Sequence, residues 1–162
     1  MPTSSINPPS WWQALAAFVA LPGMVAYAVP LCWAMVSHWH GRYRAGGVAL
    51  VLIGTTLLLT CVREFYVAGR GTLAPWSPPQ RLVTTGPYRF SRNPMYVAVT
   101  IILAGWATFF GEPALLIYAL ATACAFHVRV VLAEEPFAAR VFGVEWASYR
   151  SRTLRWVGWR SI

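Results

Sequence analysis

The sequence contains no lysine and no aspartate, and only 11% of its 162 residues are charged. In soluble globular domains about a quarter of the residues are charged. Hydrophobic residues make up 57% of this chain, and its mean hydropathy is +0.51. The composition excludes an ordinary soluble domain and predicts an integral membrane protein.

Acidic residues are also scarce, since five glutamates stand against 13 arginines and the net charge is +8. The arginines lie beside apolar stretches, and no stretch is long and polar enough to form a separate water-soluble domain. Their position indicates contact with the anionic headgroups of membrane lipids and argues against nucleic acid as a partner.

Cysteine is rare, and its distribution argues against a metal site. Cys32, Cys61 and Cys124 occur singly in three separate hydrophobic stretches. The sequence has no C-x-x-C pair of the kind that holds zinc. We therefore expect buried free thiols and no bound metal.

Long hydrophobic runs are the feature that the sequence does possess. A membrane-spanning helix needs about 20 apolar residues to cross roughly 30 Å of hydrocarbon. Four stretches are long enough or nearly so, at about residues 11–37, 45–66, 94–110 and 113–133. We predict an all-α, polytopic membrane protein with about four transmembrane helices, forming a single domain over residues 1–162. Pro22, Gly23 and Pro30 interrupt the first stretch, which favours one kinked helix and leaves a re-entrant hairpin as the alternative.

Arginine is concentrated in two segments, and this asymmetry predicts the orientation of the helices. The segment between the second and third spans contains Arg63, Arg70, Arg81, Arg89 and Arg92, and the tail contains Arg140, Arg150, Arg152, Arg155 and Arg160. The turn between the third and fourth spans has no basic residue. We expect both arginine-rich segments on the cytoplasmic side. Arginine without lysine, together with abundant alanine, points to a bacterial inner membrane.

Two segments are neither spans nor simple linkers. Residues 69–94 are rich in proline and glycine, which leaves little room for regular structure, yet they include Trp76, Tyr88 and Phe90. A cytoplasmic loop folded back on the membrane surface is therefore expected.

After Pro136, aromatic and aliphatic residues alternate with arginines, which is typical of an amphipathic helical segment at the membrane interface. We expect that segment to break near Gly143 and to cover any pocket beneath it.

Asn93 and Pro94 predict the start of the third span. Asparagine is a preferred N-cap residue, and proline at the first helical position loses no hydrogen bond. The positive end of the helix dipole, with Arg92 beside it, would form a site for an anionic group. The alternative is an ordinary capped helix whose arginine contacts lipid phosphate.

Ionisable residues at the end of a span are candidates for function because they are costly there. The fourth span ends with His127, Arg129, Glu134 and Glu135. In a regular α-helix, His127 and Glu134 share a face, whereas Arg129 points roughly the opposite way and would reach for headgroups. His127 and Glu134 are expected to line a polar pocket, unless His127 bonds a backbone carbonyl in the core. The two glutamates need a positive partner, or else lie at the favourable start of a helix beginning at Pro136.

An ordered set of short motifs resembles the isoprenylcysteine carboxyl methyltransferase family and the related phospholipid methyltransferases. The resemblance covers about residues 60–157. It runs through Gly69-Arg70-Gly71-Thr72, Pro75, Pro78-Pro79, Leu82-Val83, Gly86-Pro87-Tyr88-Arg89, Arg92-Asn93-Pro94-Met95-Tyr96, His127, Glu134-Glu135, Phe142-Gly143, Tyr149 and Arg155-Trp156. The family's loop often reads R-H-P where this chain has Asn93, a side chain that caps and donates hydrogen bonds but does not titrate.

The resemblance implies an integral membrane methyltransferase that binds S-adenosylmethionine on the cytoplasmic side, within about residues 86–162. The cofactor-binding residues that it implies are Tyr88, Arg92, Asn93, Pro94, Tyr96, His127, Glu134 and Glu135. The chemistry of the residues agrees, since Glu134 and Glu135 suit positive or hydroxyl groups and Arg92 at a helix start suits a carboxylate. No Rossmann-type glycine loop is present, which excludes a soluble-type cofactor fold.

The expected reaction is methyl transfer to a lipophilic acceptor, such as the carboxylate of an isoprenylcysteine-like lipid. A carboxylate is already ionised and needs no base, and Arg150, Arg152 or Arg155 would orient it. An aminophospholipid acceptor is the alternative, and His127 or a glutamate would then take up the proton. A non-catalytic membrane subunit or small transporter is the alternative from another class.

Overall fold

The computed structural model describes residues 19–37, 44–69 and 80–158, and the regular elements in these ranges are helices. In chain order they are π-helix η1 (Val19–Ala28), α2 (Val29–Val36), α3 (Ala45–Val67), 3-10 helix η2 (Gly86–Arg89), α4 (Pro94–Phe110), α5 (Pro113–Arg129), π-helix η3 (Val130–Glu134) and α6 (Glu135–Arg152). The prediction of an all-α chain is confirmed.

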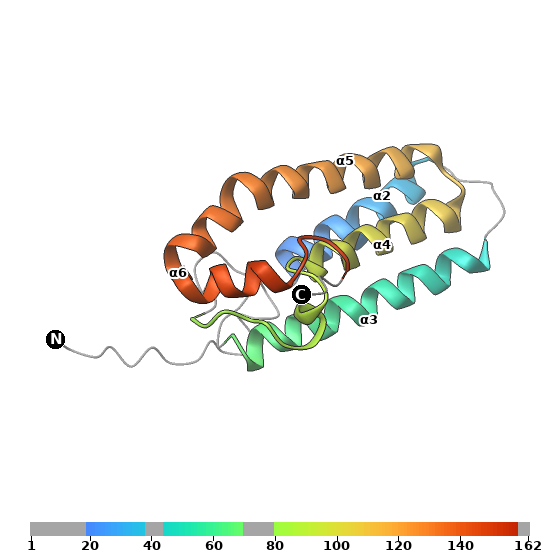
Figure 1. Ribbon diagram of the computed structural model, residues 1–162. Helices are drawn as coiled ribbons and strands as arrows, with labels where there is room; N and C mark the ends of the chain where they lie inside the picture. The colour runs from blue at the N-terminus through green and yellow to red at the C-terminus, as the bar shows by residue number, and fades with distance from the viewer. Residues whose placement is uncertain (1–18, 38–43, 70–79, 159–162) are drawn as a thin grey trace.

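The long helices lie lengthwise beside one another, and α6 folds back across one end of the bundle (Figure 1). Helices α3 and α4 pack most closely because glycines line their contact. A Cβ atom at Gly47 would clash with the backbone nitrogen of Phe109, and one at Gly105 would lie 2.8 Å from the backbone nitrogen of Val51. Small residues at such contacts let helix backbones approach within a membrane, where packing rather than hydrophobic exclusion holds helices together.

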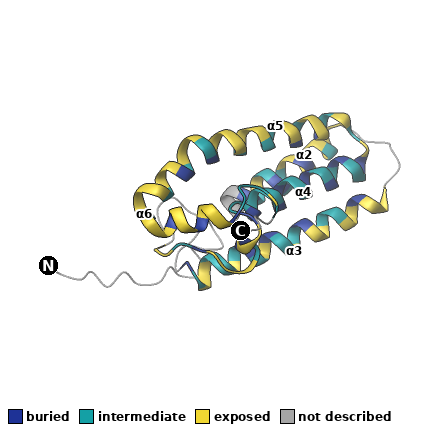
Figure 2. Cartoon of the chain, in the orientation of Figure 1, coloured by how far each residue is buried: buried dark blue, intermediate teal, exposed yellow. Residues whose placement is uncertain are grey.

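The outer faces of the bundle are apolar and exposed (Figure 2). Leu52, Ile53, Leu116, Ile117 and Leu120 are all at least half exposed, whereas the centre contains fully buried side chains such as Leu58 and Ile102. An apolar surface of this extent is unfavourable in water, so the outer faces as well as the core need an apolar environment, which lipid provides. The surface therefore agrees with the membrane location expected from composition.

Two helical stretches, Ala45–Val67 and Pro113–Arg152, are long and apolar enough to cross a membrane. Pro22–Val36 and Pro94–Phe110 are shorter apolar helices. The predicted count of four spans therefore stays a prediction. Residues 11–18, at the start of the first predicted span, lie outside the described residues.

The first apolar segment is one continuous helical path from Val19 to Val36, with Pro22 inside its π-helical part. Side chains from other helices bond carbonyls of this irregular part. Trp106 Nε1 donates to the Ala26 carbonyl at 3.0 Å, and Tyr118 Oη donates to the Val25 carbonyl at 3.3 Å. The described part thus follows the kinked-helix alternative and not the hairpin.

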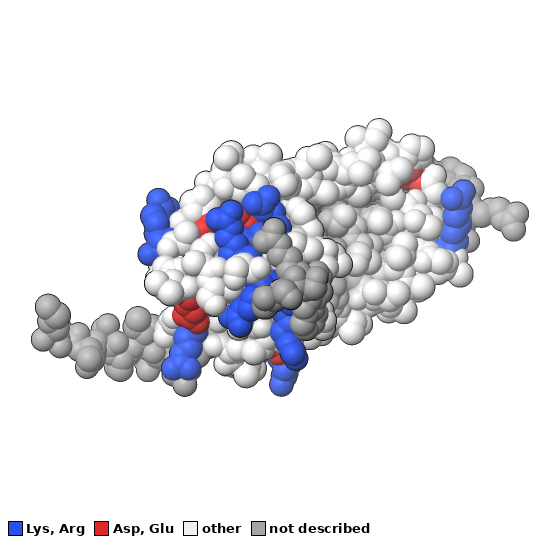
Figure 3. All heavy atoms as spheres, viewed as in Figure 1, with Lys and Arg blue, Asp and Glu red and all other residues white. Residues whose placement is uncertain are grey.

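Charged side chains gather at the two ends of the molecule, and most of those visible lie at the end that holds α6 (Figure 3). The two arginine-rich segments meet there, since the Arg92 N–H donates to the Leu154 carbonyl at 2.9 Å. Helix α6 breaks at Gly143, whose φ of 48° and ψ of −116° are not helical, as the sequence predicted. Its two halves enclose the region described next.

Candidate active site

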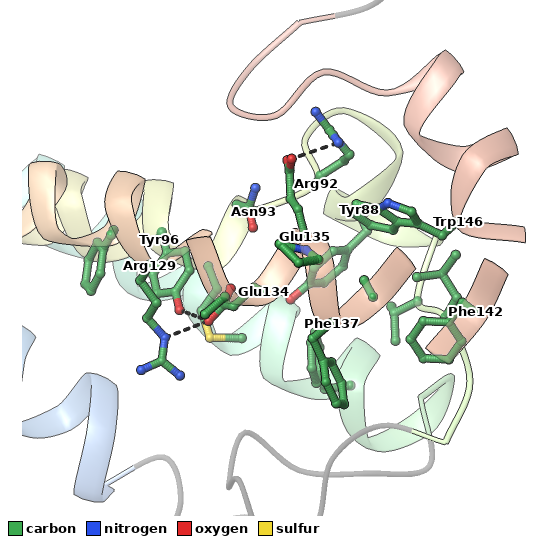
Figure 4. Close-up of a pocket in the computed structure, with 18 of the residues that line it drawn as sticks. Tyr88, Arg92, Asn93, Tyr96, Arg129, Glu134, Glu135, Phe137, Phe142 and Trp146 are labelled. Atoms are coloured by element: carbon green, nitrogen blue, oxygen red, sulfur yellow. Dashed lines mark hydrogen bonds and ion pairs between the residues drawn. The ribbon is translucent and has the colours of Figure 1, made fainter. Parts of the chain in front are cut away.

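A cavity of about 970 Å³ opens at the arginine-rich end of the bundle. Pockets for small molecules usually measure about 300–1,000 Å³, so this cavity is at the large end of that range. Its lining is contributed by η1, α3, the 81–93 loop, α4, α5, η3 and α6. The residues whose side chains carry the argument below are Tyr88, Arg92, Asn93, Tyr96, Arg129, Glu134, Glu135 and Trp146 (Figure 4).

The π-helix η3 places Arg129 and Glu134 side by side. Arg129 Nε donates to Glu134 Oε1 at 2.7 Å, and the Tyr96 hydroxyl donates to the same oxygen. In a regular α-helix, residues five apart point about 140° away from each other, since each residue turns the helix by about 100°. A π-helix bonds residue i to i+5, which brings such a pair together. The expectation that Arg129 points away from Glu134 is therefore wrong.

Glu135 is held between two arginines. Arg155 donates to it through Nε and Nη2 at 2.8 and 2.9 Å, and Arg92 Nη1 lies 3.0 Å from its Oε1. Burial raises the pKa of Glu135, but the two arginines more than offset this and hold it below its ordinary value. Both predicted glutamates thus have positive partners within the protein, namely Arg129 for Glu134 and the pair Arg92 and Arg155 for Glu135.

Arg92 is a buried cation whose hydrogen-bonding capacity is not fully used. Its side chain is 8% exposed, and burial lowers its pKa while Glu135 works in the opposite direction. Although Nη1 forms the ion pair, neither Nη1 nor Nε meets a described hydrogen-bond partner in good geometry. The guanidinium lies 5.5 Å from the centre of the Trp146 ring, and buried Trp146 Nε1 also lacks a partner among the described residues. The two side chains offer donors that a ligand would satisfy.

The second half of α6 and the segment that follows it fix the loop that carries Arg92. Asn93 Nδ2 donates to the Arg155 carbonyl at 3.0 Å, and the Tyr149 hydroxyl donates to the Tyr88 carbonyl at 2.7 Å. Asn93 occupies the N-cap position of α4, as predicted, but its side chain makes no capping bond. The predicted capping contact is therefore wrong, and the Asn93 amide is instead oriented by the bond that its Nδ2 donates to the tail. Pro94 opens the helix and is buried beside the pocket.

A family model described as phospholipid methyltransferase matches residues 43–145. The chain belongs to the phospholipid methyltransferase family. No curated protein and no solved structure matches the chain.

Membership of the phospholipid methyltransferase family agrees with the resemblance noted from the motifs. It indicates a membrane-associated methyltransferase that uses S-adenosylmethionine and acts on a lipid-like substrate. The match includes the loop, α4, α5 and the glutamate pair, and ends inside α6. The pocket therefore lies largely within the part that defines the family.

Six of the eight cofactor-binding residues that the family resemblance implies line the cavity: Tyr88, Arg92, Asn93, Tyr96, Glu134 and Glu135. Pro94 borders it. His127 does not line it, because its Nδ1 accepts a hydrogen bond from Trp156 Nε1 at 3.3 Å and the two rings stack. The cofactor roles of these residues remain predictions.

The three arginines that were expected to orient an acceptor do not line the cavity. Arg152 bonds back to Ser148, Arg150 is exposed, and the Arg155 side chain is bound to Glu135. Sequence reasoning missed two other residues that line the cavity, Arg129 and Trp146. It assigned Arg129 to headgroups, and it treated Trp146 as part of a surface helix. An unpaired indole in an amphipathic segment gives no signal of its burial.

The described residues contain no group of three or more histidine, cysteine or glutamate side chains placed to hold a metal ion. The family's cofactor provides a separate test of what the site could bind. S-adenosylmethionine carries a carboxylate, an ammonium, a sulfonium and several hydrogen-bonding groups. The unsatisfied donors of Arg92 and Trp146 suit the carboxylate, and the carboxylates of Glu134 and Glu135 bring compensating negative charge. The residues present fit this cofactor.

Proposed function

We propose that this protein transfers a methyl group from S-adenosylmethionine to the carboxylate of an isoprenylcysteine-like or similar lipid. The observation that carries the proposal is the buried pair of unsatisfied donors at Arg92 and Trp146, inside a cavity that also meets apolar helix faces. Unsatisfied buried donors cost about 1–3 kcal/mol each, and a ligand that accepted hydrogen bonds from them would offset this cost. The family match supplies the class of that ligand.

When bound, S-adenosylmethionine supplies an activated methyl group on its sulfonium sulfur. The protein's contribution is to hold the reacting groups in line and to exclude water. Arg92 and Trp146 would bind the cofactor carboxylate, and Tyr96 would fix Glu134 on the other side of the pocket. The lipid carboxylate is ionised at neutral pH, so no residue has to accept a proton for the ester to form.

The apolar part of the cavity supports a lipid as the second substrate. Val25, Val99, Phe126 and Leu132 line the same space as the polar residues. A lipid tail would lie against these side chains while its headgroup stays at the arginine-rich end. We place that end at the cytoplasmic face of a multi-pass bacterial inner-membrane protein, because both arginine-rich segments meet there.

An aminophospholipid acceptor is the second candidate, favoured by the description of the matching family. Methylation of an amine releases a proton, which a carboxylate of the site would accept. Glu134 Oε2 is the better candidate, because no described hydrogen bond engages it and Glu134 is 36% exposed. Glu135 is already bound through both oxygens.

Calorimetric titration of S-adenosylmethionine into the protein in lipid nanodiscs tests the proposal. Trp146→Phe keeps an aromatic ring beside Arg92 but removes the indole donor, and we expect about 5- to 20-fold weaker binding. Trp33→Phe is the matched control, since Trp33 is an exposed indole of α2 outside the cavity. Absence of cofactor binding by the wild-type protein would refute the enzyme function and favour a non-catalytic membrane subunit.

A further inference from the structure

We infer that Arg129 binds the anionic group of the lipid acceptor and thereby selects which acceptors enter the pocket. This inference rests on the function proposed above and assigns a role to a residue outside the predicted cofactor set. In the proposed reaction the anionic group is the carboxylate that becomes methylated. In an aminophospholipid it would be the phosphodiester.

Arg129 lies where the pocket meets the lipid-facing surface. It lines the cavity, and its neighbours on the helix, Val128 and Leu132, are 53% and 72% exposed apolar residues. A charge beside lipid-facing side chains is costly, so it needs an anionic partner or a path to water. An acceptor that enters from the bilayer would meet this guanidinium first.

The π-helix gives Arg129 a fixed direction. Its Nε donates to Glu134 Oε1 at 2.7 Å, a contact that a regular α-helix would not allow. An arginine that only reaches for headgroups needs no such contact with an inward carboxylate. Departures of this kind within a helix are frequently found at functional sites.

The ion pair leaves the far edge of the guanidinium available. Figure 4 shows the two terminal nitrogens of Arg129 pointing away from Glu134, and the side chain is 59% exposed. Arg92 lies at a different end of the pocket in the same view. Pro22 and Val25 of η1 also line the cavity and offer apolar surface for a lipid tail. Paired nitrogens of a guanidinium match the two oxygens of a carboxylate.

The charge balance of the lining favours an anionic ligand. Four arginines face the cavity, namely Arg81, Arg92, Arg129 and Arg140, against two glutamates. Both glutamates are already paired with arginine. S-adenosylmethionine brings one carboxylate but also an ammonium and a sulfonium, so it adds positive charge to this lining. An anionic group on the acceptor would bring the charges closer to balance.

Steady-state kinetics in nanodiscs test the inference with N-acetyl-S-farnesylcysteine as acceptor. We expect Arg129→Gln to raise the KM for this acceptor by about 10- to 100-fold, with the KM for S-adenosylmethionine changed by less than about 3-fold. The acceptor KM of Arg129→Lys should fall between the values of the wild-type protein and Arg129→Gln, because lysine keeps the charge and loses the planar fork. The carboxamide of the same compound, used as a competitive inhibitor, provides a ligand that lacks the charge. The wild-type preference for carboxylate over carboxamide should disappear in Arg129→Gln.

Arg63→Gln is the matched control. Arg63 also lies near the end of a span and beside a glutamate, is 70% exposed, and does not line the cavity. Nanodiscs of phosphatidylcholine, with and without phosphatidylglycerol, separate acceptor binding from general attraction to anionic lipid. An equal KM change in both variants that depends on phosphatidylglycerol would overturn the inference, as would an unchanged KM or an unchanged carboxylate preference in Arg129→Gln. A wild-type protein that binds S-adenosylmethionine but methylates phosphatidylethanolamine alone would refute the proposed carboxylate reaction and move the Arg129 contact to the phosphodiester.

Discussion

Neutralising Glu135 is predicted to destabilise the fold more than any change among the exposed charges. Glu135 is the common partner of Arg92 and Arg155, and its side chain is 10% exposed. Glu135→Gln preserves size and removes the negative charge. Arg92, which is 8% exposed, would then remain as an uncompensated buried cation.

The exposure of each partner sets the expected magnitudes. Removing one member of a buried ion pair costs about 3–5 kcal/mol. The Glu135→Gln variant still offers an amide oxygen to the arginines, so we expect a loss of about 3 kcal/mol. Arg155 is 30% exposed, and Arg155→Gln should cost about 1–2 kcal/mol because Arg92 still balances Glu135. Arg63 is 70% exposed in its ion pair with Glu64, so Arg63→Gln should cost less than about 1 kcal/mol.

Thermal unfolding in detergent, followed by the reactivity of buried Cys61 toward a thiol-specific dye, measures this order. Cys32 and Cys124 are replaced by serine in all variants so that Cys61 alone reports unfolding. The predicted order of midpoint temperatures is Arg63→Gln highest, then Arg155→Gln, then Glu135→Gln. Equal midpoints for Glu135→Gln and Arg63→Gln would refute the claim that the Arg92–Glu135–Arg155 network is buried and coupled.

Two further predictions concern helix packing and pH. A Cβ atom at Gly47 would clash with the backbone of α4, whereas one at Gly46 would meet nothing within 4 Å. Gly47→Ala should therefore cost about 1–3 kcal/mol, and Gly46→Ala should leave the midpoint temperature unchanged or slightly raised. The reverse order would contradict the α3–α4 contact. Because the folded protein holds the pKa of Glu135 below its ordinary value, this residue stabilises the fold at neutral pH, and the stabilisation is lost as the pH falls through the depressed folded-state pKa. The wild-type midpoint should therefore drop more steeply below about pH 4.5 than that of Glu135→Gln, and parallel curves would count against the ion pair.

Much of the fold could be predicted because hydropathy and helix signals are local. Pro94 and Pro113 start helices as expected, and Gly143 breaks α6 where the arginine and aromatic pattern changes. The π-helices could not be foreseen, because they arise from contacts with neighbouring helices and leave no periodic signal. The side-chain bonds of Trp106 and Tyr118 to carbonyls of η1 are contacts of this kind.

The candidate site could be predicted in outline but not in its pairing. Arg92 and the two glutamates do meet at one cavity, as the motifs implied. Sequence reasoning treated Arg92 and Glu135 as separate ends of the pocket, whereas the structure pairs them directly. It also placed His127 with Glu134 by counting α-helical turns, and the unwinding at η3 invalidates that count beyond Arg129. Which partner satisfies which charge depends on tertiary distances that spacing alone does not contain.

Methyl transfer itself is the most direct test of the account. The wild-type protein in nanodiscs should transfer labelled methyl groups from S-adenosylmethionine to N-acetyl-S-farnesylcysteine. The product should be a methyl ester, which releases labelled methanol when treated with base. Label that resists base and resides on the amine of phosphatidylethanolamine would contradict the carboxylate as acceptor, and no transfer to any lipid would contradict the central claim that this cavity is a methyltransferase active site.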